Sequence, residues 1–323
     1  MTRLRWRHCV VTIAVMTACS GRAPTVVQPV FTIPQAEAAL WPRGIQVEYR
    51  PPTEQQRRAL DLLIGTLWRG VAPPVTPKLT ALATEAHMEL ALWIVAGRPT
   101  WVVREPAADP HGLGIYLVHA AAAPSGRAIL LQAPHVYFDR QTQFIASAMF
   151  WTPGTPMQIH GLFTNSVHRF QQADHLRERR GFNPADVAHN SEHPFQTATS
   201  AVLKAGPVMV IQLHGFDGDS QTASATATAI VSAARPEGST EESTRIAATL
   251  SSVLGASVVR YPEESQSFGG LDNVQGKLVS TAPDAQFVHI ELELELRKRM
   301  REPDLAVRWA NAIVEAISAT RPP

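Results

Sequence analysis

Residues 128–135 read AILLQAPH, a short apolar run that ends in a histidine, and two later stretches repeat this design. Residues 208–214 read VMVIQLH, and residues 287–296 read FVHIELELEL, which carries Glu291. Short continuous apolar runs are typical of strands that helices cover on both faces. Ligands of an open α/β sheet bind beyond the carboxyl ends of its strands, so we expect the polar residues on these runs to share one site.

Strand and helix patterns alternate from about residue 100 to the end of the chain, which predicts an α/β domain over residues 99–323. The expected architecture has three layers around a mixed sheet. The expected strands cover residues 100–104, 114–119, 128–133, 157–163, 208–213, 229–233, 256–261 and 286–296. The expected helices cover residues 140–150, 194–204, 241–254 and 303–320.

The segment before this domain predicts an N-terminal helical layer over residues 53–98. Thr53 can cap a helix over residues 54–68, and a second apolar pattern of helical spacing runs over residues 79–95. Residues 20–52 are rich in Pro, Thr, Val and Gln without sustained periodicity. This composition predicts a tether.

The first 19 residues have the pattern of a secretion signal. Three arginines precede a short apolar stretch over residues 10–16, which is too short for a membrane-spanning helix. The following Met-Thr-Ala-Cys19 resembles the lipobox of bacterial lipoproteins, which implies acylation of Cys19 and a location at the cell envelope, facing the periplasm or the exterior. An ordinary secretory signal is the alternative.

Cysteine and charge content narrow the chemistry further. Both cysteines, Cys9 and Cys19, fall inside the signal segment. The remaining chain therefore forms no disulfide, and any metal must be held by nitrogen and oxygen ligands. The 29 basic and 28 acidic residues form no long run of either sign, so no nucleic-acid partner is expected.

Two histidines and a carboxylate are the ligand set of hydrolytic zinc sites. His135 and His214 each end an apolar strand pattern, and Asp139 follows His135 by four residues. Asp139 has a second interpretation, as the cap of a helix starting at the next residue. His189 and His193, in a polar segment ahead of a helix, are alternatives for the third ligand.

A late strand pattern supplies candidates for a general base. Glu291, Glu293 and Glu295 alternate with apolar residues, so all three are expected on one face of a strand. Acidic residues that alternate along a strand commonly form a solvent-exposed face, and we expect Glu295 to be exposed for this reason. Glu291 is the predicted base and Glu293 is its competitor.

Substrate contacts are expected in the loop after the strand at residues 157–163. Asn165, His168 and Arg169 lie there, and an arginine fork suits a substrate carboxylate. A second segment, SFGGLDNVQG at residues 267–276, is either a loop that closes over the site or an ordinary turn.

The order of these motifs resembles the N-formylglutamate amidohydrolase family and, more distantly, the zinc carboxypeptidases. This resemblance implies a phosphorylase/hydrolase-like α/β fold, zinc bound by two histidines and a carboxylate, and a late-strand glutamate as base. Two departures are visible. The carboxypeptidase pattern His-x-x-Glu is here His135-x-x-x-Asp139, and the asparagine-arginine pair is split into Asn165 and Arg169.

The resulting prediction is a zinc-dependent hydrolase that cleaves an amide or peptide bond in a small molecule or peptide bearing a carboxylate. Two other functions compete with it. Gly218-Asp219-Ser220 resembles the GDS motif of serine esterases, although G-x-S-x-G and a late Asp-x-x-His are absent. The third is a lipid-anchored binding protein without catalysis.

Overall fold

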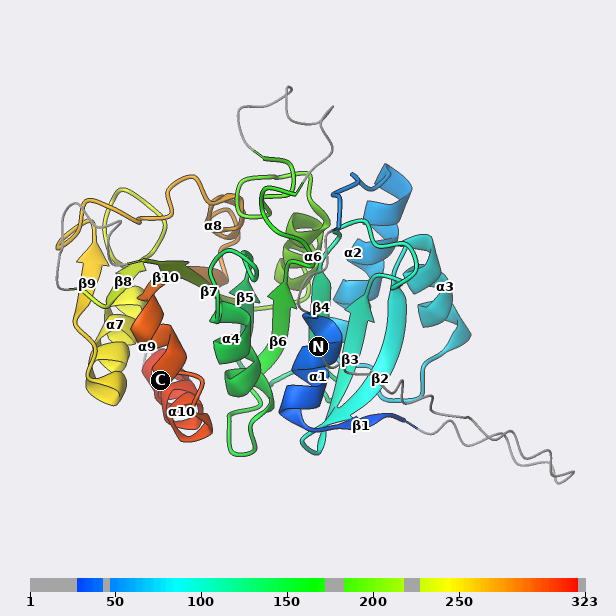
Figure 1. Ribbon diagram of the computed structural model, residues 1–323, viewed down its shortest axis with the longest axis horizontal. Helices are drawn as coiled ribbons and strands as arrows, with labels where there is room; N and C mark the ends of the chain where they lie inside the picture. Colours follow the sequence, from blue (N-terminus) through cyan, green and yellow to red (C-terminus); the bar gives the residue numbers. More distant parts are fainter. Residues whose placement is uncertain (1–27, 43–46, 172–182, 218–226, 319–323) are drawn as a thin grey trace, which may run out of the picture.

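The computed structural model describes residues 28–42, 47–171, 183–217 and 227–318. Within these residues, ten strands form one mixed sheet in the order β1-β2-β3-β4-β6-β5-β7-β10-β8-β9 (Figure 1). The strands are β1 (Val30–Phe31), β2 (Glu89–Val95), β3 (Arg98–Arg104), β4 (Ile115–His119), β5 (Ala128–Ala133), β6 (Ile159–Thr164), β7 (Val208–Phe216), β8 (Ala229–Ser232), β9 (Val258–Tyr261) and β10 (Ala285–Glu293).

Helices cover both faces of this sheet, which confirms the predicted three-layer α/β architecture. One large apolar cluster contains side chains from α1, α4, α7 and α10, and a second contains side chains from α2, α3 and α6. The helices are α1 (Ile33–Leu40), α2 (Glu54–Trp68), α3 (Pro77–Glu85), α4 (Thr142–Trp151), α6 (Pro194–Leu203), α7 (Glu241–Leu254), α8 (Val274–Val279), α9 (Leu294–Arg299) and α10 (Pro303–Ser318). No helix in the described part of the chain is long and apolar enough to span a membrane.

The four central strands of the sheet run parallel to one another. β5 pairs with β6 on one side and β7 on the other, and β7 pairs with β10. Their carboxyl ends therefore meet at one edge, in the upper part of Figure 1. The apolar runs recognised in the sequence are β5, β7 and β10, so their terminal polar residues arrive at the same edge.

Strand alternation gives this edge a polar face. On β7, Val208 and Val210 belong to the cluster under α2, α3 and α6, and Gln212 and His214 continue the same face toward the carboxyl end. The parallel β10 follows the same rule. Its residues Phe287, His289 and Glu291 pair in register with Val210, Gln212 and His214.

The second predicted N-terminal helix is wrong over its latter half. Helix α3 ends at Glu85, and residues 89–95 form β2, which pairs antiparallel with β3. A two-residue hairpin turn at Ala96 and Gly97, with φ of 49° and 80°, joins the two strands. The pairing with β3 therefore overrides the helical spacing of the apolar residues. The predicted boundary between the helical layer and the α/β domain, at residue 98, falls inside this hairpin.

The predicted tether is wrong for residues 30–41. Residues 30–31 add β1 parallel to β2, and α1 buries Ala36 and Leu40 against the sheet. The indole nitrogen of Trp41 then donates to Thr164 Oγ1 at 3.0 Å. An eight-residue helix is too short to show a clear period in the sequence. The predicted signal segment and Cys19 lie outside the described residues.

Candidate metal centre

His135, Asp139 and His214 lie together at the carboxyl edge of the central strands. One ligand atom from each lies within 4.8 Å of the others, and all three side chains are buried. Asp139 Oδ2 is 3.2 Å from His135 Nδ1 and 3.1 Å from His214 Nδ1. The structure thus brings together the three residues that the sequence proposed as ligands.

A tight turn after β5 places His135 and Asp139 on the same side. The amide of Asp139 donates to the carbonyl of His135 at 2.7 Å, which closes a helical turn around residues 136–138. Helix α4 begins only at Thr142, and its N-cap is Gln141 rather than Asp139. The capping interpretation of Asp139 is therefore wrong, and its carboxylate faces the two imidazoles instead.

Each histidine is also held at its outer nitrogen. His135 Nε2 lies 2.8 Å from Asp186 Oδ1, and His214 Nε2 lies 2.7 Å from Gln212 Oε1. Both partners are acceptors, so each Nε2 can donate to its partner, and in that neutral form each Nδ1 presents a lone pair. Two lone pairs and a carboxylate oxygen then converge on one buried point. Such a convergence requires a cation or additional protons.

The spacing of these atoms fits a zinc ion. Two ligands at about 2.1 Å from a tetrahedral zinc lie about 3.4 Å apart, close to the two distances of 3.2 and 3.1 Å around Asp139 Oδ2. Metal-binding histidines ordinarily donate their second nitrogen to a carboxylate or carbonyl, as both do here. The site could therefore bind a metal through His135, Asp139 and His214.

The pKa values of these residues also indicate that the site favours a positive charge. Burial lowers the pKa of His135, but the carboxylates of Asp139 and Asp186 outweigh it and raise that pKa to about 9. Burial raises the pKa of Asp139, but His135 and His214 outweigh burial and hold it well below its usual range. Burial, and next the neighbouring His289, lower the pKa of His214 to about 4. His135 thus carries the compensating proton that a metal would replace.

Asp186 is a central residue that sequence reasoning missed. Besides His135, its carboxylate contacts Arg169 and lies 3.2 Å from His189 Nδ1. The backbone amide of Ala188 also donates to Asp186 Oδ1 at 3.2 Å, which fixes the carboxylate in its loop. Asp186 comes 51 residues after His135, in a segment noted in the sequence only for its histidines.

The alternative ligands His189 and His193 do not join this group. His193 is the N-cap of α6: its Nδ1 accepts from the amide of Phe195, and its Nε2 lies 3.0 Å from the carbonyl of Gly112. Both of its nitrogens are therefore engaged in holding the fold. His189 faces Asp186 from the more exposed side.

Glu291 lies beside the three ligands, on the neighbouring strand. It pairs in register with His214, and adjacent strands are about 4.8 Å apart. Its Oε1 is 3.2 Å from His289 Nε2, and its buried Oε2 has no hydrogen-bond partner among the described residues. A buried carboxylate oxygen with a free lone pair is available to accept a proton. His289, two residues earlier on the same face, was not predicted.

The structure gives different roles to the two later glutamates. Strand β10 ends at Glu293 rather than residue 296, and Glu293 Oε2 accepts from the amides of Glu295 and Leu296 at 2.8 and 3.2 Å. Glu293 therefore caps α9. The expectation that Glu295 shares the face of Glu291 is wrong, because Glu295 lies in α9 and pairs with Lys298 on the surface.

The loop after β6 holds the three predicted substrate residues. Asn165 is buried, its Nδ2 donates to the carbonyl of Ala185 at 3.1 Å, and its Oδ1 accepts from the amide of Ser166 at 2.8 Å. These bonds tie the β6 loop to the loop of Asp186. His168 Nδ1 accepts from the amide of Phe170 at 3.3 Å. Both residues shape the loop that carries Arg169.

Arg169 reaches from this loop to the metal centre. Its Nη2 pairs with Asp186, and its Nη1 lies 3.5 Å from His135 Nδ1. The guanidinium carbon lies 5.1 and 5.2 Å from the ring centres of Phe138 and Phe170. Arg169 Nε is buried without a partner among the described residues. A donor that the fold leaves free thus lies next to the candidate ligands.

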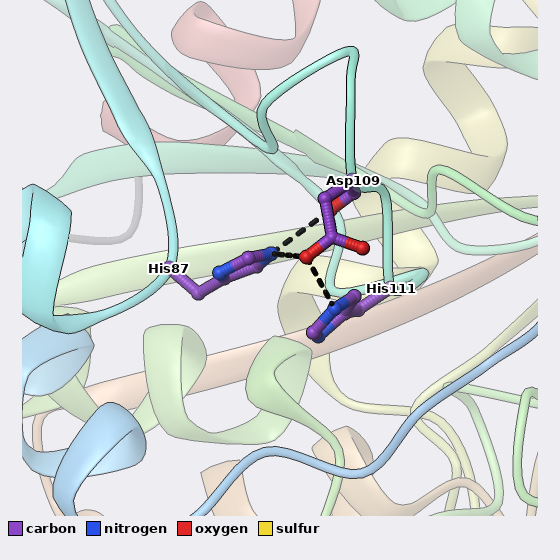
Figure 2. Close-up of side chains that lie close together, drawn as sticks. All are labelled: His87, Asp109 and His111. Atoms are coloured by element: carbon purple, nitrogen blue, oxygen red, sulfur yellow. Dashed lines mark hydrogen bonds and ion pairs between the residues drawn. The ribbon is translucent and has the colours of Figure 1, made fainter.

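Figure 2 shows a second group of the same composition, His87, Asp109 and His111. His111 Nε2 lies 3.1 Å from Asp109 Oδ2, but His87 Nε2 lies closer to the backbone carbonyl of Asp109, at 2.9 Å, than to its carboxylate, at 3.5 Å. Arg50 also pairs with this carboxylate, whose side chain is 53% exposed. The group is accounted for as a solvated ion-pair cluster, in contrast to the buried convergence at His135.

Comparisons with known proteins gave no match in sequence and matches to solved structures at low scores. No protein family model matches the sequence, and no curated protein matches it. Among solved structures, a carboxypeptidase A candidate from Shewanella denitrificans OS-217 superposes with a TM-score of 0.40 at 11% identity, over 64% of this chain and 60% of that one. The chain thus spans less than two thirds of the length of that protein.

Two further structures have similar scores. The N-formylglutamate amidohydrolase of Ralstonia eutropha JMP134 gives a TM-score of 0.39 at 13% identity, over 61% of this chain and 97% of that one. A metallo-carboxypeptidase from Burkholderia cenocepacia gives a TM-score of 0.41 at 10% identity, over 77% of this chain and 70% of that one.

Proposed function

We propose that this chain is a zinc-dependent hydrolase that cleaves an amide or peptide bond in a carboxylate-bearing substrate. One observation carries the proposal: His135 Nδ1, His214 Nδ1 and Asp139 Oδ2 converge in a buried place, next to a glutamate with an unpartnered oxygen. The outer nitrogens of both histidines have other partners, so their Nδ1 atoms face the convergence point. Zinc is favoured because two imidazoles and a carboxylate suit it, and no cysteine lies among the described residues.

A zinc ion held there would polarise the scissile carbonyl and lower the pKa of a water molecule. Glu291 can accept the proton of the attacking water at Oε2 and deliver it to the nitrogen of the leaving amine. His289 holds the other oxygen of Glu291 and so orients the carboxylate. The C–N bond breaks as the water oxygen bonds to the carbonyl carbon, and the products are a carboxylic acid and an amine.

The proposal is tested on the purified protein by metal analysis and by hydrolysis assays. We expect one zinc ion per chain, and zinc-dependent release of amine from N-acyl amino acids or short peptides with a free carboxylate. Protein without stoichiometric zinc after incubation with the ion would refute the metal centre. Zinc without hydrolysis of either substrate class would favour a binding protein, and zinc-independent ester hydrolysis would favour Ser220, which lies outside the described residues.

Arg169 is proposed to hold the substrate carboxylate. The unpartnered Nε and the position of the guanidinium beside the centre support this role. Arg169→Ala should raise KM by about tenfold to a hundredfold, since a hydrogen bond to a charged group contributes about 1.5–3 kcal/mol. Zinc content should not change. Arg104→Ala, which removes a surface arginine paired with Glu89, is the control, and equal kinetics in both variants would exclude Arg169 from substrate binding.

We also propose that the protein works at the bacterial cell envelope, anchored by a lipid on Cys19 and facing the periplasm or the exterior. The basic residues, the short apolar stretch and the Met-Thr-Ala-Cys19 sequence support this proposal. Membrane fractionation of Cys19→Ser tests it, because loss of acylation should release the protein from the membrane. Unchanged membrane association in the variant would contradict the lipid anchor.

A further inference from the structure

We propose that Arg297 is a positioning residue that holds the turn of Asp139 at a fixed separation from the end of β7, so that Asp139 and His214 can share one metal ion. The inference deepens the proposed function and rests on it where metal affinity is concerned. Arg297 lies on α9 and is 2% exposed. The chemistry described above assigns no role to this buried guanidinium.

The two segments that carry these ligands separate from each other at the edge of the sheet. The pairing of β5 with β7 ends at Gln132 and Gln212. Both ligands lie past this point, His214 further along β7 and Asp139 in the turn after β5. The backbone ladder of the two strands therefore does not fix the separation of Asp139 and His214, and another contact must do so.

Arg297 joins the two segments by hydrogen bonds to their backbones. Its Nη1 donates to the carbonyl of Arg140 at 2.6 Å, and its Nη2 donates to the carbonyl of Phe216 at 3.0 Å. Arg140 directly follows Asp139 in the turn. Phe216 ends β7, the strand that carries His214. Because the planar guanidinium presents its donors as a rigid fork, it fixes the separation of the two carbonyls.

Gly215 allows the guanidinium to lie directly against β7. A Cβ atom at this position would overlap the guanidinium of Arg297, so the close approach requires glycine. A glycine inside a strand weakens the strand and often marks the close approach of another group. Gly215 lies between His214 and Phe216. Arg297 therefore packs on the backbone of β7 directly beside a candidate ligand.

The partners of Arg297 indicate a role in geometry rather than in balancing charge. Both close acceptors are neutral backbone carbonyls. The carboxylate of Asp217 lies 3.5 Å from Nη2, and its side chain is 68% exposed. A buried arginine that only balances charge is expected to pair closely with a buried carboxylate. The charge of Arg297 also acts on the nearby Asp139, so the test must separate charge from geometry.

The test is the Arg297→Lys variant. Lysine keeps the positive charge, but its ammonium is a single point that cannot hold two carbonyls as a fork does. Zinc affinity, measured by competition with a chromogenic chelator, should fall about 10- to 100-fold, the usual effect of losing a residue that orients metal ligands. In crystals of the zinc-free protein, Asp139 Oδ2 and His214 Nδ1 should stay close to 3.1 Å apart in the wild type and lie further apart in the variant.

Gly215→Ala tests the same contact from β7 and leaves Arg297 in the chain. The added methyl group takes the place of the guanidinium, so zinc affinity should fall by a similar factor. The two changes together should cost no more than the larger one alone, because both remove one interaction. Losses that multiply in the double variant would show that the two residues act separately and would overturn the shared contact.

Arg98 provides a matched control, because its guanidinium also joins two backbone carbonyls. Its Nη1 donates to Phe150 at 3.1 Å, and its Nη2 donates to Thr155 at 2.7 Å. Arg98 begins β3, which runs in the same direction as β6, so it lies at the opposite edge of the sheet. Arg98→Lys should lower the thermal unfolding temperature but leave zinc affinity unchanged. An equal fall in zinc affinity would assign the effect to lost stability and overturn the proposal.

The possible outcomes distinguish this inference from the proposed function. A wild-type protein that binds no zinc refutes the metal centre, and the separation of Asp139 and His214 in the zinc-free crystals then decides the role of Arg297. A wild-type protein that binds zinc, together with unchanged affinity in Arg297→Lys, overturns the role of Arg297 alone. Equal separations in the zinc-free wild type and variant would overturn it as well. If Arg297→Lys does not fold, Gly215→Ala decides by the same measurements.

Discussion

Glu291→Gln should lower kcat by about 10² to 10⁴, the usual contribution of a positioned general base. Glutamine keeps the shape of the side chain but replaces an acceptor oxygen with an amide, so it cannot take a proton from water. Zinc content and KM should stay close to the wild-type values, because Glu291 is not among the three converging ligands. Steady-state kinetics on a carboxylate-bearing amide, with metal analysis of the same sample, measures both parts.

Matched variants on the same segment control for this change. Glu295→Gln should leave kcat unchanged, because Glu295 pairs with Lys298 at the surface. Glu293→Gln should weaken the cap of α9 and lower stability by about 0.5–2 kcal/mol, with little change in kcat. Loss of turnover in Glu293→Gln but not in Glu291→Gln would move the base by two residues. Unchanged turnover in both would refute the enzymatic function.

His135→Ala and His214→Ala should each abolish stoichiometric zinc and turnover, the largest effects expected for any single change. A site with three protein ligands that loses one retains too few to hold the ion at the usual geometry. Zinc at 100 times its Kd should stabilise the wild-type protein by about 2.7 kcal/mol, and the variants should lose this gain. Thermal unfolding with and without zinc measures the difference.

The two histidine variants should also differ from the wild type in stability when zinc is absent. Both histidines are buried. His135→Ala also removes one partner from each of the buried carboxylates of Asp139 and Asp186, so the variant should be less stable than the zinc-free wild type. His87→Ala and His111→Ala are the controls, because they remove the other His-Asp-His group. Loss of zinc in these controls instead would place the metal at Asp109.

The site residues that were predicted correctly from the sequence share one property. The sequence immediately around each of them is sufficient to assign its strand. An apolar run followed by a histidine identifies β5 and β7. Both faces of these strands are buried, so their residues are continuously apolar instead of alternating between apolar and polar. The parallel arrangement then brings both histidines to one edge. Residues 79–95 show the limit of such patterns, because a helical spacing and a strand spacing coexist there and pairing with β3 selects the strand.

The sequence by itself determined the α/β class, the strands that carry His135, His214 and Glu291, and the nitrogen and oxygen character of the ligands. Only the tertiary structure decided which residues hold those ligands in place. Asp186 reaches His135 across 51 residues, and Asn165 reaches Ala185 in the loop of Asp186 across 20. Such contacts depend on how loops and strands meet in space, because a hydrogen bond needs two atoms at about 3 Å and no local period encodes that proximity.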